Sequence, residues 1–191
     1  MRILIAEDET IIRLDVRTLL EKAGHDVVAE ARDGEEAVSL AAEHDPELIV
    51  MDVRMPHLDG IEAARRITER KPVPIVMLTA YAEHDLVTRA SEAGAFAYLV
   101  KPFREVDLLP ALDTARARFA ELSALRDEAA DLAEALASRK AVERAKGILM
   151  RHEGIDEAEA FRRIRAASQK TGRTMRVVAE ALIATVDESP A

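Results

Sequence analysis

The sequence predicts an α/β fold for residues 1–118, a doubly wound parallel sheet of five strands. Three observations predict it. Short apolar runs alternate five times with segments whose apolar residues recur at helical spacing. Turn-forming residues such as Pro56 and Gly60 follow the runs. The run Leu48–Asp52 is apolar up to its final aspartate, as in a strand buried on both faces of a parallel sheet.

Each element has its own signal. Runs rich in apolar and β-branched residues predict strands at residues 2–6, 25–30, 48–52, 74–78 and 96–100. Apolar residues at spacings of three and four predict helices at residues 11–20, 35–44, 61–67 and 84–93, and a longer one from residue 105. Gly24 and Gly94 follow two of these helices and are expected to end them.

Composition excludes several classes of protein. The 191 residues are 49% apolar, enough to bury a core, but only 3% aromatic, so we expect an aliphatic core. The chain has no Cys, which excludes a disulfide scaffold and thiolate metal sites. No apolar stretch is long enough to cross a membrane, and Met1–Ala6 is too short for a signal peptide. We therefore expect a soluble, cytoplasmic protein without a membrane partner.

The net charge of −9 is spread unevenly. Between Arg139 and Arg176 there are 11 Lys/Arg and 5 Asp/Glu, a net charge of +6, so the remainder carries −15. A basic segment on an acidic chain indicates a polyanionic partner for that segment. A solvated helix surface has the same composition, and charge alone does not separate the two.

Polar residues stand where the predicted strands end. They are Glu7 and Asp8, Asp52, Thr79 and Lys101. In a parallel sheet these ends meet at one edge, where open α/β folds place their chemistry. Carboxylates brought together there repel one another unless a cation lies among them, and oxygen ligands of this kind suit Mg²⁺. A carboxylate nucleophile, a hydroxyl, an ammonium and Mg²⁺ are what phosphoryl transfer to an aspartate needs.

The motifs around these residues match those of a known protein family. Residues 1–118 closely resemble the receiver domain of bacterial two-component response regulators, a flavodoxin- and CheY-like fold. The matching pieces occur in order and each lies at a strand end: Ile5–Glu9, Met51–Pro56 with Asp59 and Gly60, Leu78–Ala80, and Tyr98–Pro102.

The resemblance implies a role for each site residue. Asp52 is the expected phosphoacceptor, and a sensor histidine kinase the expected donor. Asp8, Asp52 and the backbone carbonyl of Arg54 would bind Mg²⁺ directly, and Glu7 through water. Thr79 and Tyr98 resemble the switch pair of the family. Lys101 resembles its phosphate-binding lysine. The Lys101–Pro102 bond is expected to be cis, as it usually is in the family. No enzyme activity is expected beyond the domain's own phosphoryl transfer and dephosphorylation.

A connector of residues 119–138 follows, within a helix expected to run from Glu105 to about Met150 without a strong stop. Its apolar residues form two short seams, Leu108–Leu122 and Leu122–Leu136, with a change of phase between them. Such seams are typical of a coiled coil, and we expect a homodimer through residues 105–140. The alternative is that the seams pack on this chain's own helices.

A small all-α output unit is expected at residues 125–186, overlapping the connector. After Ser138 the apolar face changes, and Asp156 with Glu159 has capping-box spacing before a second helix. A third helix follows Thr174. The unit resembles the ANTAR domain, the RNA-binding output module of antitermination regulators, in the matching pieces Arg139, Val142–Met150, Glu159–Phe161, Arg165–Ala166 and Val178–Ala179. The whole chain resembles an actinobacterial-type phosphorylation-dependent antitermination regulator, which implies paired RNA stem-loops as ligand.

Six basic residues are candidate RNA-phosphate contacts: Lys140, Arg144, Lys146, Arg151, Arg165 and Lys170. Phe161, the one aromatic residue of the unit, is assigned to its core. Two alternatives remain open. Three small helices with a basic surface also fit a DNA-binding transcriptional regulator, and a helical tail also fits a protein-interaction output.

Overall fold

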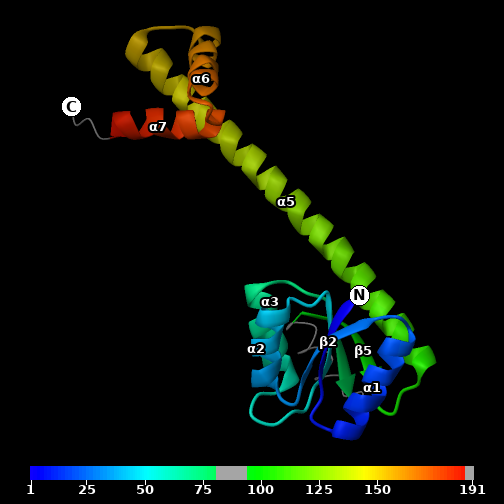
Figure 1. Cartoon of the computed structure of the whole chain (residues 1–191). Helices are drawn as coiled ribbons and strands as arrows, with labels where there is room; N and C mark the ends of the chain where they lie inside the picture. The colour runs from blue at the N-terminus through cyan, green and yellow to red at the C-terminus, as the bar shows by residue number, and fades with distance from the viewer. Residues whose placement is uncertain (81–93, 188–191) are drawn as a thin grey trace. The chain divides into compact units, whose positions relative to one another are not determined.

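The computed structural model describes residues 1–80 and 94–187 (Figure 1). The helix predicted at residues 84–93 lies outside them. The chain divides into two compact units, Met1–Ser123 and Ala124–Ala191, and helix α5 (Glu105–Glu153) contributes to both. No helix in the described part of the chain is both long and apolar enough to span a bilayer.

The first unit is built on a parallel sheet in the order β2-β1-β3-β4-β5, which confirms the predicted fold class. Its strands are β1 (Arg2–Ala6), β2 (Asp26–Ala31), β3 (Leu48–Asp52), β4 (Ile75–Thr79) and β5 (Ala95–Val100). Its described helices are α1 (Thr10–Lys22), α2 (Gly34–His44), α3 (Gly60–Arg70) and the start of α5. In Figure 1, α1 lies on one side of the sheet and α2 and α3 on the other.

Alternate residues of the central strands enter two separate cores. Leu4, Ile49 and Met77 face α2 and α3, while Ile5, Val50 and Leu78 face α1 and the first turns of α5. Every residue of β3 and β4 is buried. Burial on both faces explains why these strands read as continuous apolar runs rather than as alternating ones.

The first part and the middle of helix α5 have different surroundings. Leu108, Leu112 and Ala115 are buried against the sheet, so the first predicted seam belongs to the core of the receiver unit. The interpretation of that seam as a dimer contact is therefore wrong. The second seam is exposed, with Leu125 at 56% and Leu132 at 65% of full exposure.

The second unit consists of the end of α5, α6 (Glu157–Thr171) and α7 (Met175–Asp187). Its core contains Val142, Ala145, Leu149, Ala160, Ile164 and Ala179. The Asp156 side chain accepts a hydrogen bond from the Glu159 amide at 2.7 Å, as the capping-box spacing predicted. Phe161 is 40% exposed, so its assignment to the core is wrong: α6 turns Ala160 and Ile164 inward and Phe161 away from them.

Gly60 allows α3 to begin directly against the end of β3. A Cβ at this position would lie 1.9 Å from the Asp52 carbonyl oxygen, and that atom belongs to the rigid sheet. We expect Gly60→Ala to reduce the free energy of unfolding of the receiver unit by about 1–3 kcal/mol, the usual penalty of overpacking, in denaturant titrations of the full chain. Gly24→Ala is the control, because Gly24 has a φ of +79° but nothing within 4 Å of an added Cβ. Gly60 has no positive φ, so an equal loss of stability in the two variants would mean that the close approach to Asp52 costs no more than backbone strain does at Gly24.

Candidate functional site

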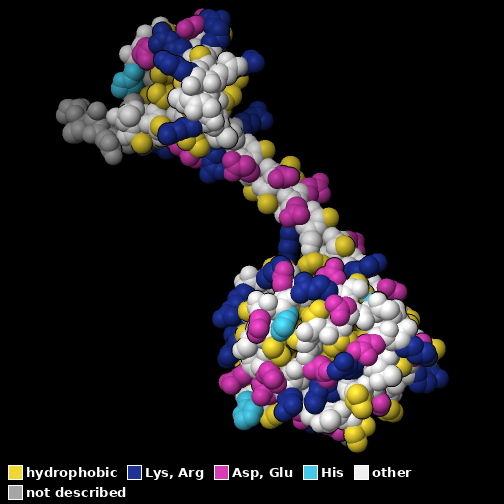
Figure 2. Space-filling view, in the orientation of Figure 1, with side chains coloured by type: hydrophobic (Ala, Val, Ile, Leu, Met, Phe, Trp, Pro, Cys, Tyr) yellow, Lys and Arg dark blue, Asp and Glu magenta, His cyan; other side chains and the backbone are white. Residues whose placement is uncertain are grey.

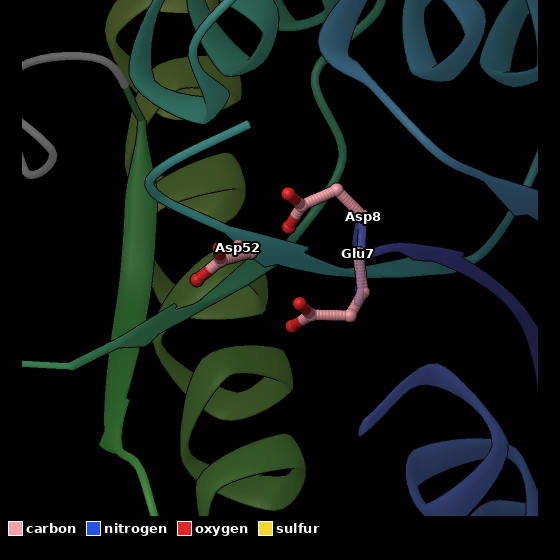
Figure 3. A group of neighbouring side chains, drawn as sticks. All are labelled: Glu7, Asp8 and Asp52. Atoms are coloured by element: carbon pink, nitrogen blue, oxygen red, sulfur yellow. The ribbon is translucent and has the colours of Figure 1, made fainter. Parts of the chain in front are cut away.

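Three carboxylates meet at the carboxyl edge of the sheet. Glu7 and Asp8 follow β1 and Asp52 is the last residue of β3, and one oxygen of each lies within 4.8 Å of the others. Figure 3 shows the three carboxyl groups pointing into the same space. Glu7 and Asp52 are buried, whereas Asp8 is exposed. The predicted clustering of these side chains is therefore observed.

Lys101 supplies the opposing charge. It follows β5, and its Nζ lies 2.6 Å from Glu7 Oε2 and 3.0 Å from Asp52 Oδ1. Although the ammonium is this close, Glu7 Oε2 has no partner with hydrogen-bond geometry among the described residues. The contact to Glu7 is thus an ion pair by distance, and a buried carboxylate oxygen remains with capacity for a further ligand.

Burial controls the protonation of this cluster. It raises the pKa of the Glu7 carboxyl above 4.5 and that of Asp52 above 3.8, even though the nearby Lys101 ammonium acts in the opposite direction. The neighbouring carboxylate raises each pKa further. Burial disfavours the charged form of Lys101 as well, but its two carboxylate partners outweigh this and raise its pKa. One lysine therefore does not compensate all the negative charge of the cluster.

The remaining predicted residues lie around this centre. Thr79 ends β4 and is 5% exposed, next to Asp52 because the Asp52–Leu78 pairing places it one residue further along. The Lys101 amide donates to the Thr79 carbonyl at 2.8 Å, and the Lys101–Pro102 bond is cis, as expected. Tyr98 is half-buried on β5, and Arg54 lies in the loop directly after β3.

Arg13 is a site residue that the sequence analysis missed. It lies on α1 and is only 8% exposed. Its guanidinium donates to the Glu7 carbonyl at 2.7 Å and lies 3.4 Å from Glu30 on β2, so it supports the turn that carries the acidic pair. The signal was present: Arg13, Val16 and Leu20 share the buried face of α1, and an arginine on an apolar face needs acceptors there.

The geometry fits a divalent cation. Three carboxylates form an oxygen-only donor set of the kind that Mg²⁺ prefers, and the buried Glu7 Oε2 contacts the Lys101 ammonium without a further hydrogen-bond partner among the described residues. A cation there would also offset the charge that burial disfavours. With Asp52 as a potential nucleophile and Lys101 beside it, the arrangement has the components for phosphoryl transfer to a carboxylate.

The predicted RNA contacts are distributed unequally. Five of the six are exposed on the second unit: Lys140, Arg144, Arg151, Arg165 and Lys170. Lys146 differs, because its side chain is 8% exposed and donates to Glu143 at 2.8 Å and Glu157 at 2.6 Å. It joins α5 to α6 and is not accessible for a phosphate. Figure 2 shows other basic side chains, in dark blue, on the surface of this unit.

We expect Asp52→Asn to raise the melting temperature by a few degrees in metal-free buffer at neutral pH, because it removes a buried carboxylate. An acid whose pKa is higher in the folded than in the unfolded state weakens folding as the pH rises past its unfolded value. The gain in melting temperature should therefore be small below about pH 3.8, the ordinary pKa of an Asp carboxyl, and should grow toward neutral pH.

Melting curves over this pH range in the presence of a chelator test the expectation. Asp15→Asn, which neutralises an exposed carboxylate on α1, is the matched control and should show no such trend. A variant less stable than the wild type at neutral pH would mean that attraction to Lys101 outweighs the effect of burial.

Known protein families match both units of the chain. The response regulator receiver domain family matches residues 3–113, and the ANTAR domain family matches residues 130–183. The transcriptional regulatory protein PdtaR of Mycobacterium tuberculosis is 50% identical over 185 residues, which cover 97% of this chain and 90% of PdtaR.

Other relatives match the first unit alone. The chemotaxis protein CheY of Bacillus subtilis is 39% identical over 113 residues, 59% of this chain and 94% of CheY. The receiver domain structure of a putative response regulator NarL from Mycobacterium tuberculosis has a TM-score of 0.58 at 30% identity and covers 60% of this chain and 95% of that one. The chain therefore belongs to the two-component response regulators, with an N-terminal receiver domain and a C-terminal ANTAR domain.

Proposed function

We propose that the protein is a cytoplasmic response regulator that a sensor histidine kinase phosphorylates on Asp52 and that then binds RNA as a transcription antiterminator. The observation that carries the proposal is the convergence of Asp52, two further carboxylates and Lys101 at one sheet edge, in a chain that also contains an ANTAR domain. The domain boundaries that we propose are 1–118 for the receiver, 119–138 for the connector and 125–186 for the output.

The chemistry begins at the Asp52 carboxylate. One of its oxygens attacks the phosphorus of a phosphohistidine; a P–O bond forms as the P–N bond breaks, and the imidazole leaves. The Lys101 ammonium, 3.0 Å from Asp52 Oδ1, is placed to pair with the transferred phosphoryl oxygens. Attack by water on the acyl phosphate then releases inorganic phosphate and restores the Asp52 carboxylate. The receiver would thus carry out its own phosphoryl transfer and dephosphorylation, and we propose no further enzyme activity.

Mg²⁺ is the cation that we propose for this site. Asp8, Asp52 and the Arg54 backbone carbonyl would hold it directly, and Glu7 through water. When bound, it neutralises charge on the transferring phosphoryl group. Glu7 keeps Lys101 oriented toward Asp52, since its carboxylate lies 2.6 Å from the same ammonium.

Thr79 and Tyr98 are the proposed switch. The Thr79 hydroxyl would donate a hydrogen bond to a phosphoryl oxygen on Asp52, and the half-buried Tyr98 would turn inward as Thr79 moves. β5 leads into α5, which continues into the output domain, so a change beside β5 has a covalent route to the RNA-binding helices. Such a switch is a local charge change that biases an element with two arrangements.

The output surface that we propose excludes Lys146. Lys140, Arg144, Arg151, Arg165 and Lys170 are exposed and remain candidate phosphate contacts. Each contact of this kind releases counterions, so binding should weaken as salt increases. The match to the ANTAR family favours RNA over the DNA-binding and protein-interaction alternatives.

The second seam of α5 supports a homodimer, narrowed from residues 105–140 to residues 122–136. Leu125, Leu132 and Leu136 are exposed at spacings of seven and four, which form one stripe along the helix. Figure 2 shows hydrophobic side chains, in yellow, at the surface along this stretch. A second copy of the same stripe would cover them.

Phosphorylation should tighten RNA binding. We expect acetyl phosphate with Mg²⁺ to raise the affinity for a two-stem-loop RNA by about 5- to 150-fold at one fixed salt concentration, the usual range of coupling between two sites. Electrophoretic mobility shift titrations would measure it. Asp52→Asn should bind with the affinity of the unphosphorylated protein under both conditions.

Three results would change the proposal. An Asp52→Asn protein that gained RNA affinity with the phosphodonor would contradict phosphorylation at Asp52 as the switch. An RNA affinity that is the same with and without the phosphodonor would support the RNA-binding function but contradict phosphorylation as its switch. Tighter binding to duplex DNA than to the structured RNA would favour the DNA-binding alternative.

The dimer is tested separately. Leu132→Glu places a charge in the stripe and should lower the mass of the phosphorylated protein in light scattering from that of a dimer to that of a monomer. Ala130→Glu, with the same added charge on another face of α5, is the matched control and should leave the dimer intact. A phosphorylated wild type that is already monomeric would exclude the proposed contact.

A further inference from the structure

Phe161 is the only aromatic residue of the ANTAR domain, and α6 holds it at the surface with 40% of its area exposed. It is absent from the apolar cluster that joins α5, α6 and α7. The domain therefore folds around aliphatic side chains and leaves the Phe161 ring partly in water. Exposure of one apolar side chain is ordinary by itself, so the groups beside the ring decide whether it can bind a ligand.

The residues around Phe161 form a stripe along α6. Ala158, Phe161, Arg165 and Gln169 are spaced by three, four and four residues and are all exposed. None of them is acidic. Arg165 and Gln169 make no hydrogen bond or ion pair within the described residues, so a guanidinium and an amide lie beside the ring with their donors available.

The rest of α6 differs from this stripe. Arg162 and Arg163 are paired with Glu159, and Arg163 also with Glu153. Glu157, one turn before Phe161, accepts from Lys146 at 2.6 Å. The Glu157 carboxylate is thus paired within the domain with the Lys146 ammonium, which Glu143 also contacts. With Arg165 in the stripe and no acid among its four residues, the stripe favours a negatively charged ligand.

We propose that Phe161 is a stacking platform for an unpaired base of the RNA, with Arg165 contacting the adjacent phosphate. This inference rests on the proposed RNA-binding function and identifies where that function reads single-stranded RNA. An aromatic face, an unpaired guanidinium and an amide are the groups that bind a splayed nucleotide, through stacking, charge and base-edge hydrogen bonds respectively.

A stem-loop ligand supplies such nucleotides, since its loop bases are not enclosed in a helix. The paired stem offers phosphates to Lys140 and Arg151 but no exposed base face to Phe161. The stripe should therefore discriminate the loop from the stem, whereas the other exposed cations should bind both.

The first experiment separates the ring from its apolar volume. Phe161→Leu keeps a large apolar side chain and removes the aromatic face, and the partial exposure of the site means that the fold should survive. We expect it to weaken binding of the full chain to a two-stem-loop RNA by about 5- to 150-fold, as for the loss of one base stack. Its affinity for a fully paired RNA duplex should not change.

The matched control is Val177→Ala on α7, where the native side chain is 42% exposed and lies outside the stripe. It should leave both affinities unchanged. Arg165→Gln should weaken stem-loop binding and reduce the slope of affinity against salt by about one contact, whereas Phe161→Leu should leave that slope as it is.

The second experiment observes stacking directly. The chain has no Trp, so Phe161→Trp introduces a single tryptophan, whose emission can be excited apart from that of the two tyrosines. Its fluorescence should be quenched on titration with the two-stem-loop RNA and much less with the duplex, while affinity is retained. Val177→Trp, a bystander fluorophore, should show little quenching with either RNA.

The outcomes are distinguishable. Full stem-loop affinity in Phe161→Leu, or unchanged fluorescence of Phe161→Trp at saturating RNA, overturns the stacking role and leaves the ring to a protein contact, while the proposed function stands. Equal quenching of both tryptophan variants also overturns it. A wild-type chain that binds neither RNA, with or without phosphodonor, overturns the proposed function and this inference together.

Discussion

The structure of the receiver domain depends on negative charge held at the edge of a parallel sheet. β1 and β3 are neighbouring strands and end at the same edge of the sheet, so the carboxylates of Glu7, Asp8 and Asp52 lie close together and repel one another. Lys101 offsets this repulsion from the end of β5, within 3.0 Å of two of the three carboxylates. The balance is incomplete, because burial and mutual repulsion still raise the pKa values of Glu7 and Asp52. A site of this kind gains stability from any cation or phosphoryl group that completes the balance of charge.

The surrounding fold keeps the cluster rigid. Gly60 lets α3 approach the carbonyl of Asp52, and the Asp59 side chain caps that helix by accepting from the Glu62 amide at 2.8 Å. On the opposite side, the buried guanidinium of Arg13 holds the carbonyl of Glu7. Both ends of the cluster are thus connected to helices on different faces of the sheet, which limits how far the carboxylates can separate.

Helix α5 shows how one periodic pattern serves different purposes. Leu112 is buried against the sheet, Leu132 is largely exposed, and Leu149 lies in the ANTAR core. Helical spacing specifies a stripe but not what covers it. The middle stretch remains available for a second copy of the chain, and Arg165 beside Phe161 has no partner among the described residues, whereas Arg162 and Arg163 pair with Glu159.

The sequence by itself determined the parallel sheet, the site residues at its edge and the helices of the output domain, because apolar periodicity and strand-end motifs are local signals. Tertiary structure decided what such signals do not contain. Arg13 became a buried support because β1 and β2 offer acceptors to α1. Lys146 became an internal ion pair and Phe161 a surface ring because each depends on how α6 is rotated against α5, which is set by the packing of Ala160 and Ile164. Burial is a property of the assembled helices, not of the sequence of any one of them.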